Sequence, residues 1–207
     1  MFKKFVSVML AGLMLFSFAA VALAEGEDDV ISVADEAVVR EVAGTSSDVS
    51  MDKEDVKQLV EKLKEVAGEY KDYHKTLPQE KKTEIKDTLK DDILKLRELR
   101  QEARTLREGI KQKRDEIKSL WPEAKKNEEL KDDVKAIKIE LKNLHDATVK
   151  LRITKLNLRM EFFQELIDGK VGDAEQTLQN IIHYKTLINA NLKAADELLQ
   201  KAVNLLQ

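Results

Sequence analysis

Histidines are the first side chains to consider for chemistry in this 207-residue chain, because imidazole serves both acid–base catalysis and metal binding. A di-iron site in a helical bundle needs a glutamate three residues before a histidine, so that both side chains point to the same iron site. The residues found three before each histidine are two lysines and one asparagine. The histidines are also far apart in the sequence, at His74, His145 and His183. We therefore expect no metal site.

Catalytic nucleophiles and phosphate-binding loops are also missing from the sequence. The chain has no cysteine, no Gly-x-Ser-x-Gly motif and no glycine-rich phosphate loop. An acidic cluster begins at Glu128-Glu129, but acids are common at helix starts because they face the positive end of the helix dipole. We expect the protein not to be an enzyme and to bind no cofactor.

Seven cations recur at three- and four-residue spacing and would form one basic face of a helix. Such a face can bind an anionic partner: an envelope polymer, a membrane surface or an acidic protein segment. Two alternatives remain open, a solvated face of a soluble coiled coil and lateral assembly of a basic edge on an acidic edge. Nucleic acid is not expected for an exported chain. The seven residues are Arg97, Arg100, Arg104, Arg107, Lys111, Arg114 and Lys118.

Two long helices must position this face. Apolar residues recur in steps of three and four from Ile85 to Leu120 and again from Leu130 to Phe162, the pattern of helices packed lengthwise. The fold class predicted is all-α, a long antiparallel helical hairpin (coiled coil) with flanking helices forming a four-helix bundle-like base. An extended oligomeric rod would use the same stripes. The predicted domain covers 51–207, with helices at about 51–76, 78–120, 123–167 and 173–207.

Helix boundaries are predicted from proline, glycine and capping residues. Pro78 and Pro122 each suit the first turn of a helix, where the missing N–H costs nothing. Gly169 lies in the turn that ends the third helix. Asp173 is then the expected N-cap of the last helix, with Gln176 as its capping-box partner.

The thickness of the core changes along the third helix. A second apolar stripe begins only after residue 148, which places a third and a fourth helix at that end. The other end would then be a two-stranded tip with Trp121 at the turn. Trp121 either covers the end of the seam or anchors a partner. The second stripe consists of Val149, Ile153, Leu156, Met160, Phe163 and Ile167.

The two edges of the predicted hairpin carry opposite charges. In an antiparallel pair each e position faces the partner's e position, and g faces g. The e positions hold Arg100, Arg107 and Arg114 against Lys131, Lys138, His145, Arg152 and Arg159. The g positions hold Glu102 and Glu116 against Asp133 and Glu140. Polar residues at Asp92, Lys113 and Lys155 interrupt the seam and are expected to set register or oligomeric state.

The first fifty residues indicate export. Residues 1–24 have a charged start, an apolar run and an Ala-x-Ala cleavage site, which predicts a signal peptide; an uncleaved membrane anchor is the alternative. Residues 25–50 hold eight acids and one base, Arg40, and are predicted to be a disordered acidic linker. An apolar patch at 30–42 could instead dock on the helical body. The expected location is the periplasm, the cell envelope or the exterior.

The stretch Thr76-Leu77-Pro78-Gln79-Glu80, at the start of a long basic helix, resembles a reordered Leu-Thr-x-x-Gln motif of Spy/CpxP-like periplasmic proteins, present here once. A signal followed by long charged helices without cysteine is similar to Skp-like chaperones. These resemblances imply an extracytoplasmic holdase-type chaperone that binds unfolded clients, and no functional residue is carried over. The preferred prediction is a non-enzymatic interaction or structural protein of the envelope, binding protein partners or itself as a homo-oligomer.

Overall fold

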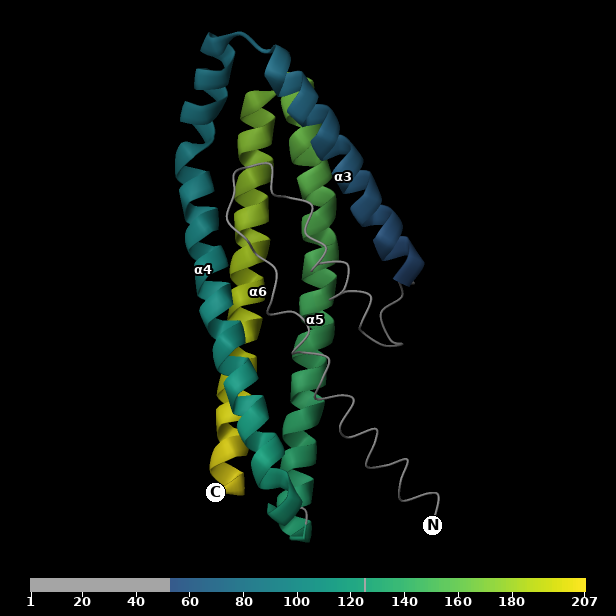
Figure 1. Cartoon of the computed structure of the whole chain (residues 1–207), viewed down its shortest axis with the longest axis vertical. Coiled ribbons are helices and arrows are strands. Elements are labelled where there is room, and N and C mark those ends of the chain that lie inside the picture. The colour runs from purple at the N-terminus through teal and green to yellow at the C-terminus, as the bar shows by residue number, and fades with distance from the viewer. Residues whose placement is uncertain (1–52, 125) are drawn as a thin grey trace.

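The computed structural model describes residues 53–124 and 126–207, which form four helices (Figure 1). They are α3 (Lys53–Thr76), α4 (Gln79–Ala124), α5 (Glu128–Ile167) and α6 (Val171–Leu206). The predicted all-α bundle is confirmed, because the described residues contain helices and no strand. The predicted signal peptide and acidic linker lie outside the described residues. No described helix is long and apolar enough to cross a membrane.

Pro78 opens α4, as its position in the sequence predicts. The backbone N–H of Leu77 donates to the carbonyl of His74 at 3.3 Å and closes the end of α3. The Pro78 carbonyl then accepts from the N–H of Lys82 at 3.1 Å, the first bond of α4. Proline at this point sacrifices no helical hydrogen bond, because the first N–H groups of a helix have no partner within it.

The turn between α4 and α5 lies later than predicted. Helix α4 continues through Pro122 to Ala124, so the predicted break at Pro122 and the predicted helix start at 123 are wrong. The ring removes only one hydrogen bond, and that loss falls in the last turn, where little helix remains to be disrupted. Asn127 starts α5 instead. Its backbone is extended, and its side chain accepts from the N–H of Glu129 at 3.0 Å.

The turn between α5 and α6 is built around Gly169, which has φ of 74°. The N–H of Lys170 donates to Glu165 at 2.8 Å and that of Gly169 donates to Leu166 at 3.2 Å, the pair of bonds of a Schellman motif. A residue with a Cβ would be strained at this φ, so glycine is required to end α5 here.

Helix α6 starts two residues before the predicted cap. It begins at Val171 with Lys170 in the N-cap position, and no side chain bonds to the first N–H groups. The predicted capping box of Asp173 and Gln176 is therefore wrong. Asp173 lies in the first turn of α6, where its charge still favours the helix dipole.

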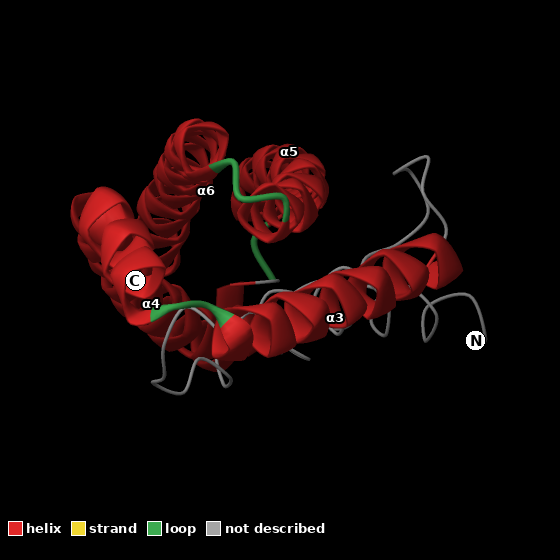
Figure 2. Ribbon diagram, turned by 90° about the horizontal axis from the view of Figure 1, so that it is seen from above, coloured by secondary structure: helices red, strands yellow, loops and turns green. Residues whose placement is uncertain are grey.

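Helix α6 lies between α4 and α5 and packs against both, whereas α3 packs against α5 (Figure 2). Although α4 and α5 are joined by a short turn, they pack on each other far less than each packs on α6. The predicted two-stranded seam is thus shared with a third helix. The physical reason is the broad apolar face of α6, which buries the stripes of both neighbours at once.

The buried side chains form two clusters along the bundle. The first draws on all four helices and corresponds to the predicted base. It contains Val60, Leu63, Ala67, Tyr70, Ile85, Leu89, Leu156, Phe162, Phe163, Leu166, Ala174, Leu178 and Ile181. The second draws on α4, α5 and α6 alone. It contains Ala103, Ile110, Ile117, Ile137, Ile188, Leu192, Ala195, Leu199, Ala202 and Val203.

The two-stranded tip is shorter than predicted, because α6 accompanies the hairpin over most of its length. At the last residue of the chain, Gln207 Nε2 donates to Glu116 Oε1 on α4 at 2.9 Å. Only the end of α4 and the start of α5 extend past this level (Figure 1). Trp121, near the end of α4, is half-buried.

Candidate interaction surface

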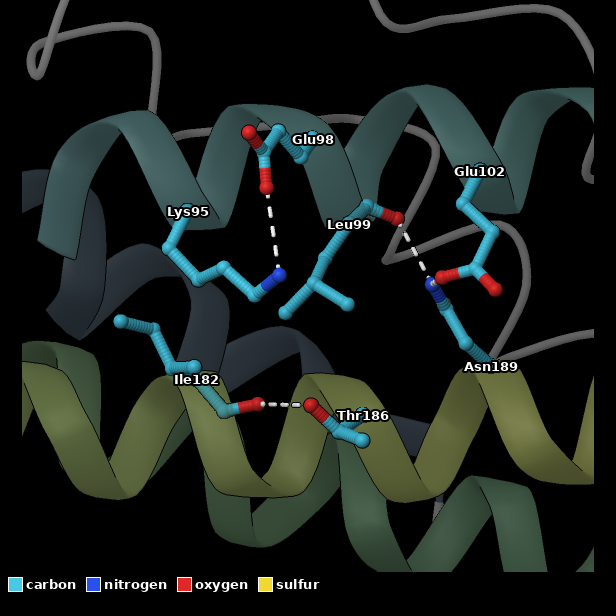
Figure 3. A network of polar contacts seen from close by, with 7 residues as sticks. All are labelled: Lys95, Glu98, Leu99, Glu102, Ile182, Thr186 and Asn189. Atoms are coloured by element: carbon cyan, nitrogen blue, oxygen red, sulfur yellow. Dashed lines mark hydrogen bonds and ion pairs between the residues drawn. The ribbon is translucent and has the colours of Figure 1, made fainter.

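The acidic edge of α4 faces α6. The Asn189 side chain, 3 % exposed, donates to Glu102 Oε2 at 2.7 Å and to the Leu99 carbonyl at 2.8 Å (Figure 3). Glu116 accepts from the last residue of the chain, as described above. Both g-position acids of α4 are therefore engaged by α6. The sequence predicts that these two acids face α5, and it does not indicate that a third helix would bind this edge.

A polar seam residue also joins α4 to α6. Lys113 Nζ lies 2.7 Å from Asp196 Oδ1, and both side chains are about three-quarters or more buried. Gly109 lies under this pair, since a Cβ there would come within 3.1 Å of Asp196 Oδ1. A partly buried ion pair of this kind favours one register of two helices over its neighbours. The role in register or oligomeric state expected for Lys113 stays a prediction, and the structure gives it a partner on α6.

The basic edge of α4 faces α5. Arg114 is 2 % exposed, and this burial lowers the pKa of its guanidinium to about 10. Burial also lowers the pKa of His145 on α5, and the positive charge of Arg114 lowers it further, while Asp146 acts in the opposite direction. Arg114 and His145 are thus close enough to interact, as predicted for facing e positions.

The predicted basic face ranges from the interior to solvent. Arg114 is buried, whereas Arg97 and Lys111 are exposed. The remaining four residues are half-buried: Arg100, Arg104, Arg107 and Lys118. Lys118 Nζ lies 3.0 Å from Asp115 Oδ1, and the arginines at 97, 100, 104 and 107 also take part in polar or electrostatic contacts. The exposed and half-buried members give α4 a cationic surface roughly 30 Å long at about 1.5 Å per residue.

Helix α5 extends this surface with cations of its own. Lys135 and Lys142 are exposed, and Lys131 and Lys138 are half-buried. Arg152 is 5 % exposed and contributes positive charge from below the surface. We define the cationic surface by its exposed and half-buried members on both helices: Arg97, Arg100, Arg104, Arg107, Lys111, Lys118, Lys131, Lys135, Lys138 and Lys142.

The cationic surface begins beyond the part of the bundle that α3 accompanies. On α5, Val149, Leu156 and Phe163 recur at seven-residue steps, and Phe163 meets Tyr70 of α3 with ring centroids 5.4 Å apart. One and two further steps towards the start of α5 reach Lys142 and then Lys135. A seven-residue step returns to nearly the same side of a helix. The side of α5 that α3 covers therefore becomes cationic beyond α3.

Helix α4 changes in the same way. Ile93 packs against the four-helix cluster, and seven-residue steps from it lead to Arg100, Arg107 and Arg114. Both helices thus replace apolar residues with cations beyond the four-helix cluster. Figure 1 shows that α3 accompanies only the upper part of the bundle. Both changes are visible in the sequence, but only the fold shows that they lie beyond the same cluster.

Comparison with protein-family models, curated proteins and solved structures gives no match to this chain. Its interpretation therefore depends on its own geometry. Within the described residues, histidine, aspartate and glutamate do not gather in threes at any point suited to a metal ion. The cationic surface provides positive charge along two helices, which suits binding of an elongated anion.

Proposed function

We propose that this chain is an exported, non-enzymatic interaction protein of the cell envelope that binds an acidic segment of a partner protein on its cationic surface. The apolar and charged N-terminal sequence supports export. The length of the surface supports an elongated partner, and cations repeated along both α4 and α5 suit a polypeptide with repeated carboxylates. A protein segment can lie along two helices more closely than a flat membrane can.

The distribution of charge on α4 and α5 is the observation that supports this proposal. Beyond the four-helix cluster, apolar residues give way to cations on both α4 and α5, while Glu102 and Glu116 on the acidic edge of α4 accept hydrogen bonds from Asn189 and Gln207. A coiled coil whose charged faces serve only solubility does not require positive and negative side chains on separate sides, since mixed charges keep a surface soluble. Segregation of one sign produces a field that attracts the opposite charge.

Lateral self-assembly is less well supported. It would bring the basic edge of one copy against the acidic edge of another. Glu102 and Glu116 each already accept a hydrogen bond, from Asn189 and Gln207, so a second copy would have to share these carboxylates with groups of the same chain. We therefore favour a hetero-partner. Light scattering coupled to size-exclusion chromatography would detect the homo-oligomer if that assignment is wrong.

The test uses fluorescently labelled poly-L-glutamate and residues 25–207 with the eight acids of 25–50 changed to amides, so that they do not compete with the probe. The surface variant carries Lys111→Gln, Lys138→Gln and Lys142→Gln. The control variant carries Lys90→Gln, Lys193→Gln and Lys201→Gln, which remove the same charge from exposed positions elsewhere.

We expect the surface variant to bind roughly tenfold more weakly, since each exposed ion contact contributes about 0.2–1 kcal/mol. The control variant should retain most of the affinity, and added salt should weaken binding in every case. Equal losses in both variants, or no binding by the parent protein, would refute the proposal.

The holdase alternative requires exposed apolar surface for unfolded clients. Among the described residues, the exposed large apolar side chains are Leu94, Ile139 and Leu187, on three different helices. This scattering does not favour a chaperone. Aggregation of a reduced client protein, followed by light scattering with and without residues 25–207, provides the direct comparison. Suppression at near-stoichiometric ratios would restore the chaperone interpretation.

A further inference from the structure

The chain itself contains an acidic segment of the kind that the cationic surface should attract. Residues 25–50 carry eight acids and Arg40 as their single base. The rest of the mature sequence, 51–207, has slightly more basic than acidic residues. The charge of the two parts is therefore opposite in sign, and the positive charge of the helical part is concentrated on α4 and α5.

The length of this segment lets it reach the cationic surface from the start of α3. Helix α3 ends beside the start of α4, so its beginning at Lys53 points towards the section of the bundle that α3 does not accompany (Figure 1). The residues before Lys53 therefore join the described structure at the end of α3 that stands to the side of α5, away from the α3–α4 turn (Figure 1). An extended chain of this length reaches roughly 80 Å, well beyond the roughly 30 Å of the cationic surface.

We propose that residues 25–50 bind the cationic surface of α4 and α5 within the same molecule and compete there with acidic partners. This inference rests on the proposed function, because both need the surface to bind carboxylate-rich chains. Tethering raises the effective concentration of the segment to the order of millimolar. Even a weak site is then occupied, and an external partner binds only by displacing the segment.

The first experiment measures the distance directly. Because the chain has no cysteine, two introduced residues can be spin-labelled specifically. Ser32→Cys places one label in the segment, and Gln112→Cys places the other on an exposed position of α4. Double electron–electron resonance on residues 25–207 then gives the distance distribution at about 0.05 M and about 0.5 M salt, where screening differs strongly.

We expect a short, narrow distribution at low salt that becomes long and broad at high salt. The lysine substitutions of the surface variant, introduced with the natural residues 25–50, should abolish the short distances. The lysine substitutions of the control variant, introduced in the same way, should preserve them. A broad distribution at both salt concentrations would overturn the inference. Equal loss in the surface and control variants would also overturn it, because the attraction would then be non-specific.

The second experiment separates this inference from the proposed function. Affinity for poly-L-glutamate is compared between the natural residues 25–207 and the amide-substituted protein. Competition predicts that removing the acids strengthens binding by roughly tenfold or more. Equal, measurable affinity would refute the intramolecular competition while leaving the proposed function intact. If neither protein binds the probe, the proposed function fails, and the distance measurement alone decides whether the segment docks.

Discussion

At the scale of single residues, polar groups inside this bundle connect particular helices. Asn189 is the clearest case, because its amide reaches both a backbone carbonyl and a carboxylate of α4. Lys113 and Asp196 make a second connection between the same helices. Apolar contacts alone tolerate shifts between neighbouring registers, whereas a buried polar group loses its partners when the helices slide.

The contribution of Asn189 can be measured by Asn189→Ala. We expect the free energy of unfolding to fall by about 1–3 kcal/mol, because the variant leaves a buried Leu99 carbonyl with one bond fewer and removes a charge-assisted bond to Glu102. Urea unfolding gives the value. Asn180→Ala, at an exposed position of the same helix, makes the same gain in helix propensity and is the matched control. Equal effects of the two substitutions would contradict this assignment.

His145 makes stability depend on pH. Burial lowers its pKa below the ordinary value of 6.5, so the unfolded chain takes up a proton more readily than the folded one. This contribution to stability is fully present above pH 6.5 and is lost as the pH falls from there towards the folded pKa. We expect His145→Gln to flatten the decline in unfolding free energy between pH 7.5 and 5. His183→Gln, at an exposed site, is the control. An unchanged slope in His145→Gln would show that the group is not responsible.

At the scale of elements, α3 differs from the other helices because its close packing is with α5 alone among the described helices. Helix α6, by contrast, packs along both α4 and α5. An element with fewer packed neighbours opens at lower free energy than one that is surrounded. Helix α3 also decides where the cationic surface begins, so its position matters for binding as well as for stability.

Hydrogen exchange should therefore be fastest in α3 among the four helices. Phe163→Ala, which removes a ring that is 1 % exposed and contacts Tyr70, should lower stability by about 3–5 kcal/mol and accelerate exchange in α3 most. Mass spectrometry of exchanged peptides measures both effects. Ile117→Val, in the three-helix cluster, should leave α3 nearly unaffected. Protection of α3 equal to that of α6 would argue against this hierarchy.

At the scale of the whole molecule, two core clusters share one helix. Helix α6 contributes Ala174, Leu178 and Ile181 to the four-helix cluster and Ile188 to the three-helix cluster. Disrupting either cluster loosens a helix that the other cluster needs. We therefore expect the described bundle to unfold as one cooperative unit, despite its elongated form.

A pair of conservative substitutions tests this cooperativity. Ile181→Val and Ile117→Val lie in different clusters, and each should cost about 0.5–1.5 kcal/mol. Because the sites are far apart, the double variant should equal the sum within about 0.5 kcal/mol, with a single transition and unchanged denaturant dependence. Two resolved transitions in the double variant would mean that the clusters unfold separately.

The sequence by itself determined where the helices lie and which of their faces are apolar or charged. Three- and four-residue periodicity is a local property of each helix, so the stripes, the turn at Gly169, the base near the end of α5 and the basic face of α4 are all visible without a structure. The boundaries at Pro122 and Asp173 are less accurate, because they depend on one turn of helix whose small energy is outweighed by packing.

Only the tertiary structure decided which stripes face each other. An apolar stripe states that a helix has a neighbour, but it does not name the neighbour, since apolar contact is non-directional. The sequence pairs α4 with α5, whereas the fold inserts α6 between them and places Asn189 and Gln207 against Glu102 and Glu116. Both cationic halves can be seen in the sequence, but only the fold shows that they lie beyond the same four-helix cluster.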